Sequence, residues 1–122
     1  TKHKMDSEQM IINEDNARMI NNAKAAGRKV CTVGTSSMKA VETAAIIDNR
    51  VKVFNGWTNK FIFPPYEFAI SDAMITNFHP PLSSMLMQVA AFGGYELIMN
   101  AYKYAIEKKY KFFTYGDAMR II

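Results

Sequence analysis

Segments with strand character alternate with helical segments along most of this chain, and this alternation constrains the fold more than any other feature. Residues 29–33 are rich in β-branched side chains and lie between glycines, which is typical of a strand. Residues 35–48 have the apolar periodicity of a helix, and residues 67–75 return to strand character. Two further helices are expected over 83–92 and 95–109. The alternation predicts the α/β class, with at least some parallel strand pairing.

Local signals mark where several of these elements begin and end. Asn13 is a suitable N-cap for a first helix that Gly27 stops, and the small side chain of Ala26 predicts close packing on a sheet. Ser83 is a second N-cap. The spacing of apolar residues in the last helix predicts a buried stripe of Leu97, Ala101 and Ala105.

Turn signals predict two hairpins. Asn55 and Gly56 form a strong tight-turn signal between strand-like residues 51–54 and 60–63. Final strands are expected over 112–115 and 119–122, on either side of Gly116 and Asp117.

Length and composition exclude several other classes. The 122 residues, 49% of them hydrophobic, suit one domain with its own core, and no linker or repeat divides them. The single cysteine, Cys31, excludes an internal disulfide framework and a multi-cysteine zinc site, and we expect it to be inert. A net charge of +4 suits a polyanionic partner, although many ordinary domains are equally basic.

The chain has no apolar run of the roughly 20 residues needed to span a bilayer and no leader segment, so we expect a cytoplasmic protein. It opens at Thr1 without an initiator methionine, which suggests a piece of a larger protein.

The junction from strand to helix at Gly34 is the first candidate site. Thr35, Ser36 and Ser37 follow it, so hydroxyls and unpaired backbone N–H groups meet at a helix N-terminus, where a phosphate or a carboxylate would fit. The alternative is an ordinary serine cap, because no second glycine or phosphate-loop lysine follows.

The segment 76–81 is the second candidate site. His79 titrates near neutrality and follows a strand, beside Thr76 and Asn77 and before two prolines. Loops at strand ends are where α/β proteins bind ligands. The alternative is a histidine that caps the next helix or is satisfied in the core.

Three further clusters carry weaker signals. His3, Asp6, Ser7 and Glu8 gather an imidazole, two carboxylates and a hydroxyl, although a solvated chain end would look the same. Asp117 follows an aromatic residue and a glycine, which usually marks a turn. A basic, tyrosine-rich cluster suits nucleic acid or simple solvation: Tyr102, Lys103, Tyr104, Lys108, Lys109, Tyr110 and Lys111.

Taken in order, these motifs resemble one family over essentially the whole chain. They are His3, Met5, Ser7 and Glu8; residues 33–37 with Glu42; residues 72–79; and residues 115–119. This pattern is similar to the C-terminal third of the S-adenosylmethionine:tRNA ribosyltransferase-isomerases of queuosine biosynthesis. The resemblance implies one α/β unit that forms part of a larger barrel-like α/β domain, and 122 residues that are inactive by themselves.

The resemblance also implies a reaction. The ribosyl part of S-adenosylmethionine, used as a co-substrate without a metal, is transferred to the 7-aminomethyl-7-deazaguanine wobble base of tRNA and isomerised, giving epoxyqueuosine with release of adenine and methionine. On this view His79, Glu8 and Asp117 are catalytic: His79 transfers a proton, Glu8 is a base or an acid, and Asp117 holds a hydroxyl or the amine. The expected cofactor-binding residues are Gly34, Thr35, Ser36, Ser37 and Asn77.

The chain departs from the family pattern at three positions. Asp6 stands where a second histidine is usual, Lys39 where arginine is usual, and Pro80 where leucine is usual. Lysine lacks the bidentate fork of arginine.

Three other functions stay open at this point. A Rossmann-like methyltransferase would share the cofactor and the α/β class, but we find no glycine-rich first loop with an acidic ribose ligand. A non-catalytic tRNA-binding module would explain the positive net charge. A structural interaction domain would explain the many methionines but not the polar strand-end loops.

Overall fold

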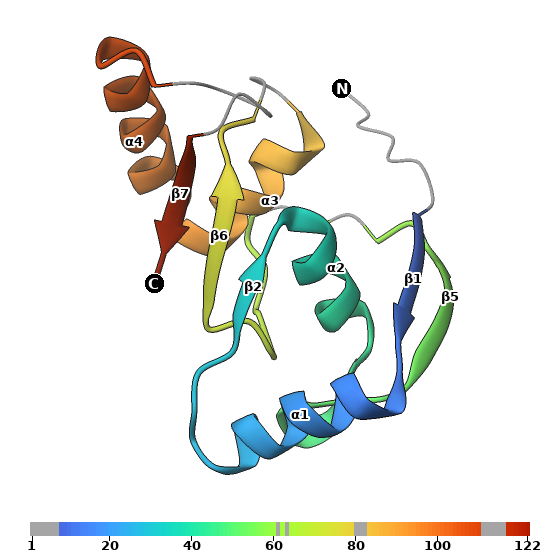
Figure 1. Cartoon of the computed structure of the whole chain (residues 1–122). Helices are drawn as coiled ribbons and strands as arrows, with labels where there is room; N and C mark the ends of the chain where they lie inside the picture. The colour runs from blue at the N-terminus through green and yellow to red at the C-terminus, as the bar shows by residue number, and fades with distance from the viewer. Residues whose placement is uncertain (1–7, 61, 63, 80–82, 111–116) are drawn as a thin grey trace.

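The computed structural model describes residues 8–60, 62, 64–79, 83–110 and 117–122 (Figure 1). Helices and strands alternate, so the predicted α/β class is confirmed. In chain order the elements are β1 (Glu8–Ile12), α1 (Glu14–Ala25), β2 (Cys31–Val33), α2 (Thr35–Thr43), β3 (Ala45–Ile46), a 3-10 turn (Ile47–Asn49), β4 (Arg50–Val51), β5 (Phe54–Thr58), β6 (Ala73–Asn77), α3 (Ser84–Gly93), α4 (Tyr95–Glu107) and β7 (Ala118–Ile121).

The strands form one three-stranded sheet and two short ribbons. β6 lies in the middle of the larger sheet, parallel to β2 with Val33 opposite Ile75, and antiparallel to β7. The predicted parallel pairing is therefore confirmed. β1 pairs with β5, and β3 pairs with β4, both antiparallel.

The helix starts follow the local signals. The Asn13 side chain accepts the backbone N–H of Asn16 at 2.8 Å, and Ser83 accepts that of Leu86 at 3.1 Å, so both predicted caps are confirmed. α2 ends at Thr43, earlier than expected, because the chain turns back to pair β3 with β4, and Asp48 has a positive φ in that turn.

The hairpin predicted at Asn55 and Gly56 is wrong. β5 runs straight through both residues, and they pair with Ile11 and Met10 of β1. A partner strand more than 40 residues earlier therefore overrides the local turn preference. Phe61 and Phe63, in the second predicted arm, lie outside the described residues.

Several other boundaries also shift. β6 begins at Ala73, so Thr76 and Asn77 belong to a strand and not to a loop. Ala26 is exposed. α4 buries Ile98, Tyr102 and Ala105, whereas Leu97 is 64% exposed. β7 confirms the last predicted strand within one residue, and the strand expected over 112–115 lies outside the described part.

α2 connects two hydrophobic clusters. Its Met38 is fully buried among side chains of the three-stranded sheet, α3 and α4, while Val41 and Ala44 pack with α1, β1 and β4. Figure 1 shows α2 between the larger sheet and the β1–β5 ribbon. Side chains at the start of α2 are consequently held from both sides.

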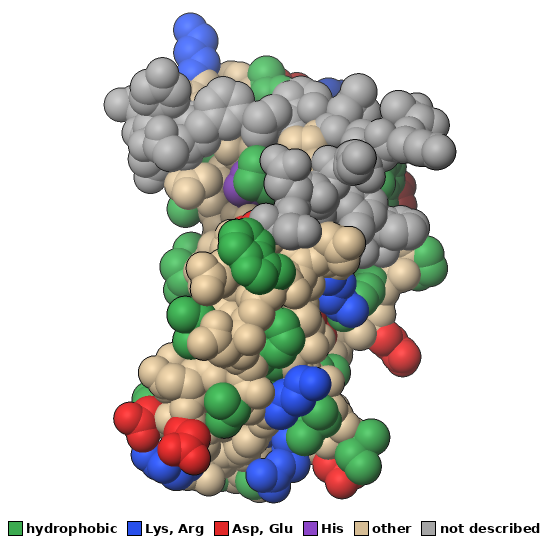
Figure 2. Space-filling model, turned by 90° about the vertical axis from the view of Figure 1, so that its right-hand side faces the viewer, with side chains coloured by type: hydrophobic (Ala, Val, Ile, Leu, Met, Phe, Trp, Pro, Cys, Tyr) green, Lys and Arg blue, Asp and Glu red, His purple; other side chains and the backbone are tan. Residues whose placement is uncertain are grey.

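Charges of both signs gather at one end of the molecule (Figure 2), which α1 forms in Figure 1. They include the exposed ion pair of Arg18 with Asp15. None of the helices described here is long and apolar enough to cross a membrane.

Candidate functional site at the carboxyl edge of the parallel strands

The two predicted strand-end sites lie at the same edge of the sheet. β2 and β6 are parallel, and the backbone N–H of Gly34 donates to the carbonyl of Ile75 at 2.7 Å. The start of α2 therefore lies beside the last residues of β6, two positions before Asn77. In open α/β sheets, ligands bind outside the carboxyl ends of the strands, near helix N-termini.

Gly34 makes the tight entry into α2. It is the N-cap residue, with a φ of +92°, and no side chain caps this helix. L side chains rarely adopt that φ, so a larger residue would be strained there. The hydroxyl residues are the first helical residues and not caps, which corrects the expectation of a serine cap.

The hydroxyls at the start of α2 point to different neighbours. Ser36 donates to the Glu8 carboxylate at 3.0 Å, whereas Ser37 lines an apolar groove of about 270 Å³ between α1, β1 and α2. The carbonyl of Thr35 accepts a 2.7 Å hydrogen bond from Gln88 of α3. The backbone N–H groups of this turn point in a common direction, so they are better suited than the Ser36 and Ser37 hydroxyls to hold one anion.

Glu8 and Ser36 were predicted for different roles, and the structure brings them together with Lys39. One Glu8 carboxylate oxygen accepts from Ser36 and the other from the Lys39 ammonium. The Lys39 side chain is 3% exposed and that of Glu8 is 37% exposed. The hydrogen bond and charge of Lys39 hold the pKa of Glu8 below its usual 4.5, against the opposing effect of burial. Glu8 is therefore ionised at neutral pH.

His79 is buried, and its ring is already hydrogen-bonded. Its Nε2 lies 2.7 Å from the hydroxyl of Thr76, and its backbone N–H donates to the Tyr102 hydroxyl at 2.8 Å. Burial lowers the pKa of the imidazole from 6.5, so the ring is neutral at pH 7. The same burial fits the alternative of a histidine satisfied in the core.

Asn77 and Asp117 meet where β6 pairs with β7. The amide Nδ2 of Asn77 donates to the backbone carbonyl of Asp117 at 3.2 Å, and Asn77 lies opposite Ala118 in the register. Asn77 is exposed, and Asp117 is partly exposed. These two residues therefore lie at the same sheet edge as Gly34 and the segment that carries His79.

Gln88 contributes to this region and was not predicted. It is 1% exposed, and its Nε2 donates to the Thr35 carbonyl, while its Oε1 has no hydrogen-bond partner among the described residues. The signal that could have found it is its polarity within the otherwise apolar segment 85–92.

Two carboxylates of the family-like motifs, the buried Glu42 and the partly exposed Asp72, stabilise the backbone around the sheet. Glu42 accepts the backbone N–H groups of Ala69, Ile70 and Ser71 at 2.8–2.9 Å. Asp72 accepts the N–H of Val30 at 2.9 Å and pairs with Lys24 at 3.2 Å. Both bind backbone groups that directly precede the parallel strands, so their described contacts stabilise the amino-terminal end of these strands, opposite the candidate site.

Other predicted residues lie elsewhere or outside the described part. His3, Asp6, Ser7 and Pro80 are not described, nor are residues 111–116, directly before Asp117. Of the basic cluster, Lys108 lies over the Tyr104 ring at 5.7 Å. Cys31 is exposed. The described residues contain no cluster of three or more side chains suited to a metal ion.

Comparison with known proteins finds relatives over the whole chain. The model of a family described as "Queuosine biosynthesis protein" matches residues 1–121. A protein of Parabacteroides distasonis named S-adenosylmethionine:tRNA ribosyltransferase-isomerase is 60% identical over 122 residues, which are 100% of this chain and 35% of that protein. A protein of the same name from Phocaeicola vulgatus is 58% identical, with the same coverage. The chain thus spans about a third of the length of these curated relatives.

A solved structure is also similar. It is an S-adenosylmethionine tRNA ribosyltransferase from Thermotoga maritima, with 38% sequence identity and a TM-score of 0.86. The match covers 92% of this chain and 39% of that one, which is consistent with part of a larger α/β domain.

Proposed function

The chain belongs to the family of queuosine biosynthesis proteins, and on this premise we propose that it is part of a ribosyltransferase-isomerase acting on tRNA. The enzyme moves the ribosyl group of S-adenosylmethionine to the aminomethyl nitrogen of a 7-aminomethyl-7-deazaguanine wobble base. It isomerises that group to an epoxycyclopentanediol, and adenine and methionine leave. The observation that carries the proposal is the 60% identity, over the entire chain, to a relative named for this activity.

The arrangement of the sheet edge supports a division of roles. The first turn of α2 holds the carboxylate of the methionine part, chiefly through the backbone N–H groups after Gly34, with Thr35 beside them. Asn77 orients ribose hydroxyls, and Asp117 holds a hydroxyl or the amine. The geometry of α2 supports this assignment because its positive end opens at the edge where Asn77 lies.

Two groups are proposed for proton transfer. The reaction needs a base that removes a proton from the carbon next to the sulfonium, and an acid that assists the departing adenine. His79 is neutral at pH 7 and can accept a proton, while Glu8 is an ionised carboxylate. We assign proton transfer to His79 and Glu8.

We further propose that the chain is the C-terminal third of this enzyme, a single α/β unit, and that the enzyme is cytoplasmic. Because the chain spans 35% of its curated relatives, the 122 residues by themselves should be a poor catalyst. Turnover by this segment comparable to that of the whole protein would contradict this proposal.

The test uses the whole protein that contains this chain. It is incubated with S-adenosylmethionine and a tRNA that carries the 7-aminomethyl-7-deazaguanine base, with the same tRNA carrying guanine as the control. The expected result is adenine release with only the first tRNA, together with epoxyqueuosine detected by mass spectrometry. Formation of S-adenosylhomocysteine would indicate a methyltransferase instead, and tRNA binding without adenine release would indicate a non-catalytic module.

A further inference from the structure

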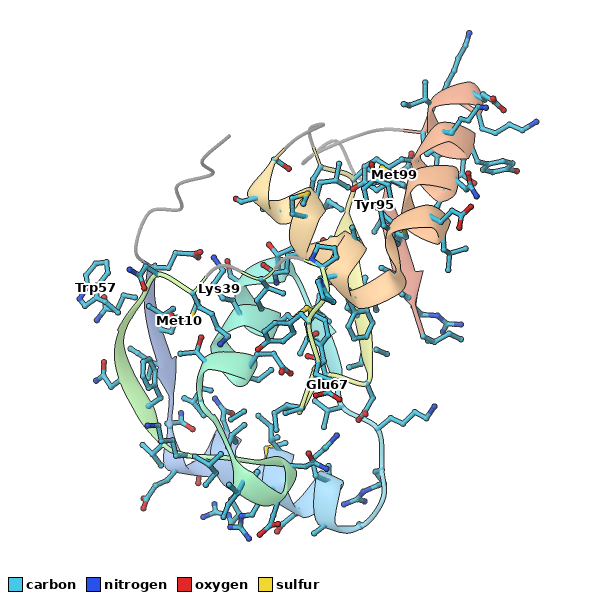
Figure 3. All side chains as sticks on the ribbon, turned by 180° about the vertical axis from the view of Figure 1, so that it is seen from behind. Met10, Lys39, Trp57, Glu67, Tyr95 and Met99 are labelled. Carbon is cyan, nitrogen blue, oxygen red and sulfur yellow. The ribbon has the colours of Figure 1, made fainter. Side chains whose placement is uncertain are left out.

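The ion pair between Lys39 and Glu8 joins a buried cation to a partly exposed carboxylate. Lys39 lies on α2 and Glu8 on β1, 31 residues apart in sequence. Figure 3 shows Lys39 on the side of α2 that faces the β1–β5 ribbon, which carries Met10 and Trp57. A buried ammonium is costly unless it is paired. Within the described part of the chain, the Lys39 ammonium is paired with the Glu8 carboxylate.

We propose that Lys39 is a positioning residue that holds Glu8 as an ionised, oriented carboxylate, so that Glu8 serves the reaction as a proton acceptor and not as an acid. This inference rests on the proposed function. In the proposed step, the C–H bond next to the sulfonium breaks and the proton binds a Glu8 oxygen. The electron pair stays on the carbon, where the positive sulfur stabilises it.

The contacts of the Glu8 carboxylate support this role. Ser36 and Lys39 each bind one of its oxygens, so the carboxylate plane is fixed from two points one turn apart on α2. The partly exposed side of Glu8 is left to meet a substrate. A glutamate is ionised at neutral pH in any case, so what Lys39 and Ser36 add is the orientation of the carboxylate, on which proton transfer depends.

No other described charged group competes for Glu8 from the elements packed against it. β5 places Thr58 opposite Glu8, and its hydroxyl contacts Thr43 and the N–H of Lys60. Glu42, the other charged residue of α2, faces the backbone of residues 69–71. Lys39 is therefore the group whose removal should change the titration of Glu8.

α2 does not depend on this ion pair to stay in place. Met38 and Ala44 are fully buried, and Glu42 accepts three backbone N–H groups. A purely structural role for Lys39 would predict a lower melting temperature with unchanged turnover per folded molecule. A positioning role predicts a change in turnover and in the titration of Glu8.

The experiment compares Lys39→Met, Lys39→Arg and the exposed control Lys52→Met in the whole protein. Adenine release gives kcat and KM, and ¹³C NMR of labelled glutamate carboxyls, assigned by Glu8→Gln, gives the Glu8 titration. Lys39→Met should raise the midpoint of the Glu8 titration and lower kcat at least about tenfold, with KM for S-adenosylmethionine within about twofold. Lys39→Arg should keep the Glu8 midpoint and kcat near those of the parent protein, and Lys52→Met should change neither quantity.

The outcomes separate the two proposals. If the parent protein releases no adenine, the proposed function fails, and the base role of Glu8 fails with it. If it releases adenine but Lys39→Met leaves kcat or the Glu8 midpoint unchanged, only the present inference is wrong. If Lys39→Met does not fold, Glu8→Gln decides, because full activity in that variant would show that Glu8 is not the proton acceptor.

Discussion

The hydroxyl oxygen of Thr76 lies 2.7 Å from Nε2 of His79, and both side chains are buried. A neutral imidazole has one donor and one acceptor nitrogen, and a hydroxyl can complement either. The contact therefore satisfies one ring nitrogen without a charge on the ring. This geometry suits both a neutral catalytic base and a structural histidine, and the turnover of a His79 variant separates the two roles.

Replacing His79 with alanine in the whole protein should lower kcat by about 10²–10⁴, the usual contribution of a general acid or base. The KM for S-adenosylmethionine should change little, because the described contacts of His79 are with Thr76 and Tyr102. Adenine release, normalised to folded protein by circular dichroism, gives the measurement. Unchanged turnover per folded molecule would make His79 structural.

The stability of the protein should depend on pH through His79. Burial lowers the pKa of the folded-state imidazole below 6.5, while the unfolded chain binds a proton near that value. The stabilisation is fully present above 6.5 and is lost as the pH falls from there through the lower folded-state pKa. The free energy of unfolding in urea, measured at pH 7.5 and 5.5, should therefore differ less in His79→Gln than in the parent protein. An identical difference in both proteins would contradict the burial argument.

Thr35→Ala and Ser36→Ala should have different effects, although the two residues are neighbours. Loss of a hydrogen bond to the charged carboxylate costs about 1–2 kcal/mol, so Thr35→Ala should raise KM for S-adenosylmethionine while kcat stays within a few-fold. Ser36→Ala removes a donor from Glu8 and should lower kcat instead. Steady-state kinetics on both variants tests this, and a loss of kcat in Thr35→Ala would place that residue in the transition state.

Gly34→Val should impair the same site more severely than Thr35→Ala. The φ of +92° at Gly34 is strained for any L side chain, and a β-branched one tolerates it least. The expected result is a larger rise in KM for S-adenosylmethionine together with a lower melting temperature. A variant with parent-like KM and melting temperature would show that the entry into α2 tolerates a side chain.

Glu42→Gln should destabilise the fold by about 2–4 kcal/mol, because charge-assisted hydrogen bonds contribute about 1.5–3 kcal/mol each and a glutamine amide cannot accept at both ends. Three backbone N–H groups depend on this buried carboxylate. Urea unfolding measures the effect. Glu14→Gln, at an exposed position of α1, is the matched control and should change the free energy of unfolding by less than about 0.5 kcal/mol. Equal effects in the two variants would contradict the structural role of Glu42.

Features that depend on residues close together along the chain could be predicted from the sequence alone. Asn13 and Ser83 cap their helices because each accepts an N–H only three positions later. The alternation of elements predicted the α/β class and some parallel pairing, which the structure shows between β2 and β6. The family also followed from the sequence, because its motifs occur in order along the chain and the family model matches residues 1–121.

Which of these residues come into contact depends on long-range packing and could not be predicted from the sequence. Asn55 and Gly56 locally favour a turn, yet the backbone hydrogen bonds gained by pairing with β1 outweigh that preference. That same pairing places β1 beside α2, where Glu8 binds Ser36 and Lys39. Caps and turns act over a few residues of backbone, whereas an ion pair across 31 residues requires the strands and helices between them to be packed first.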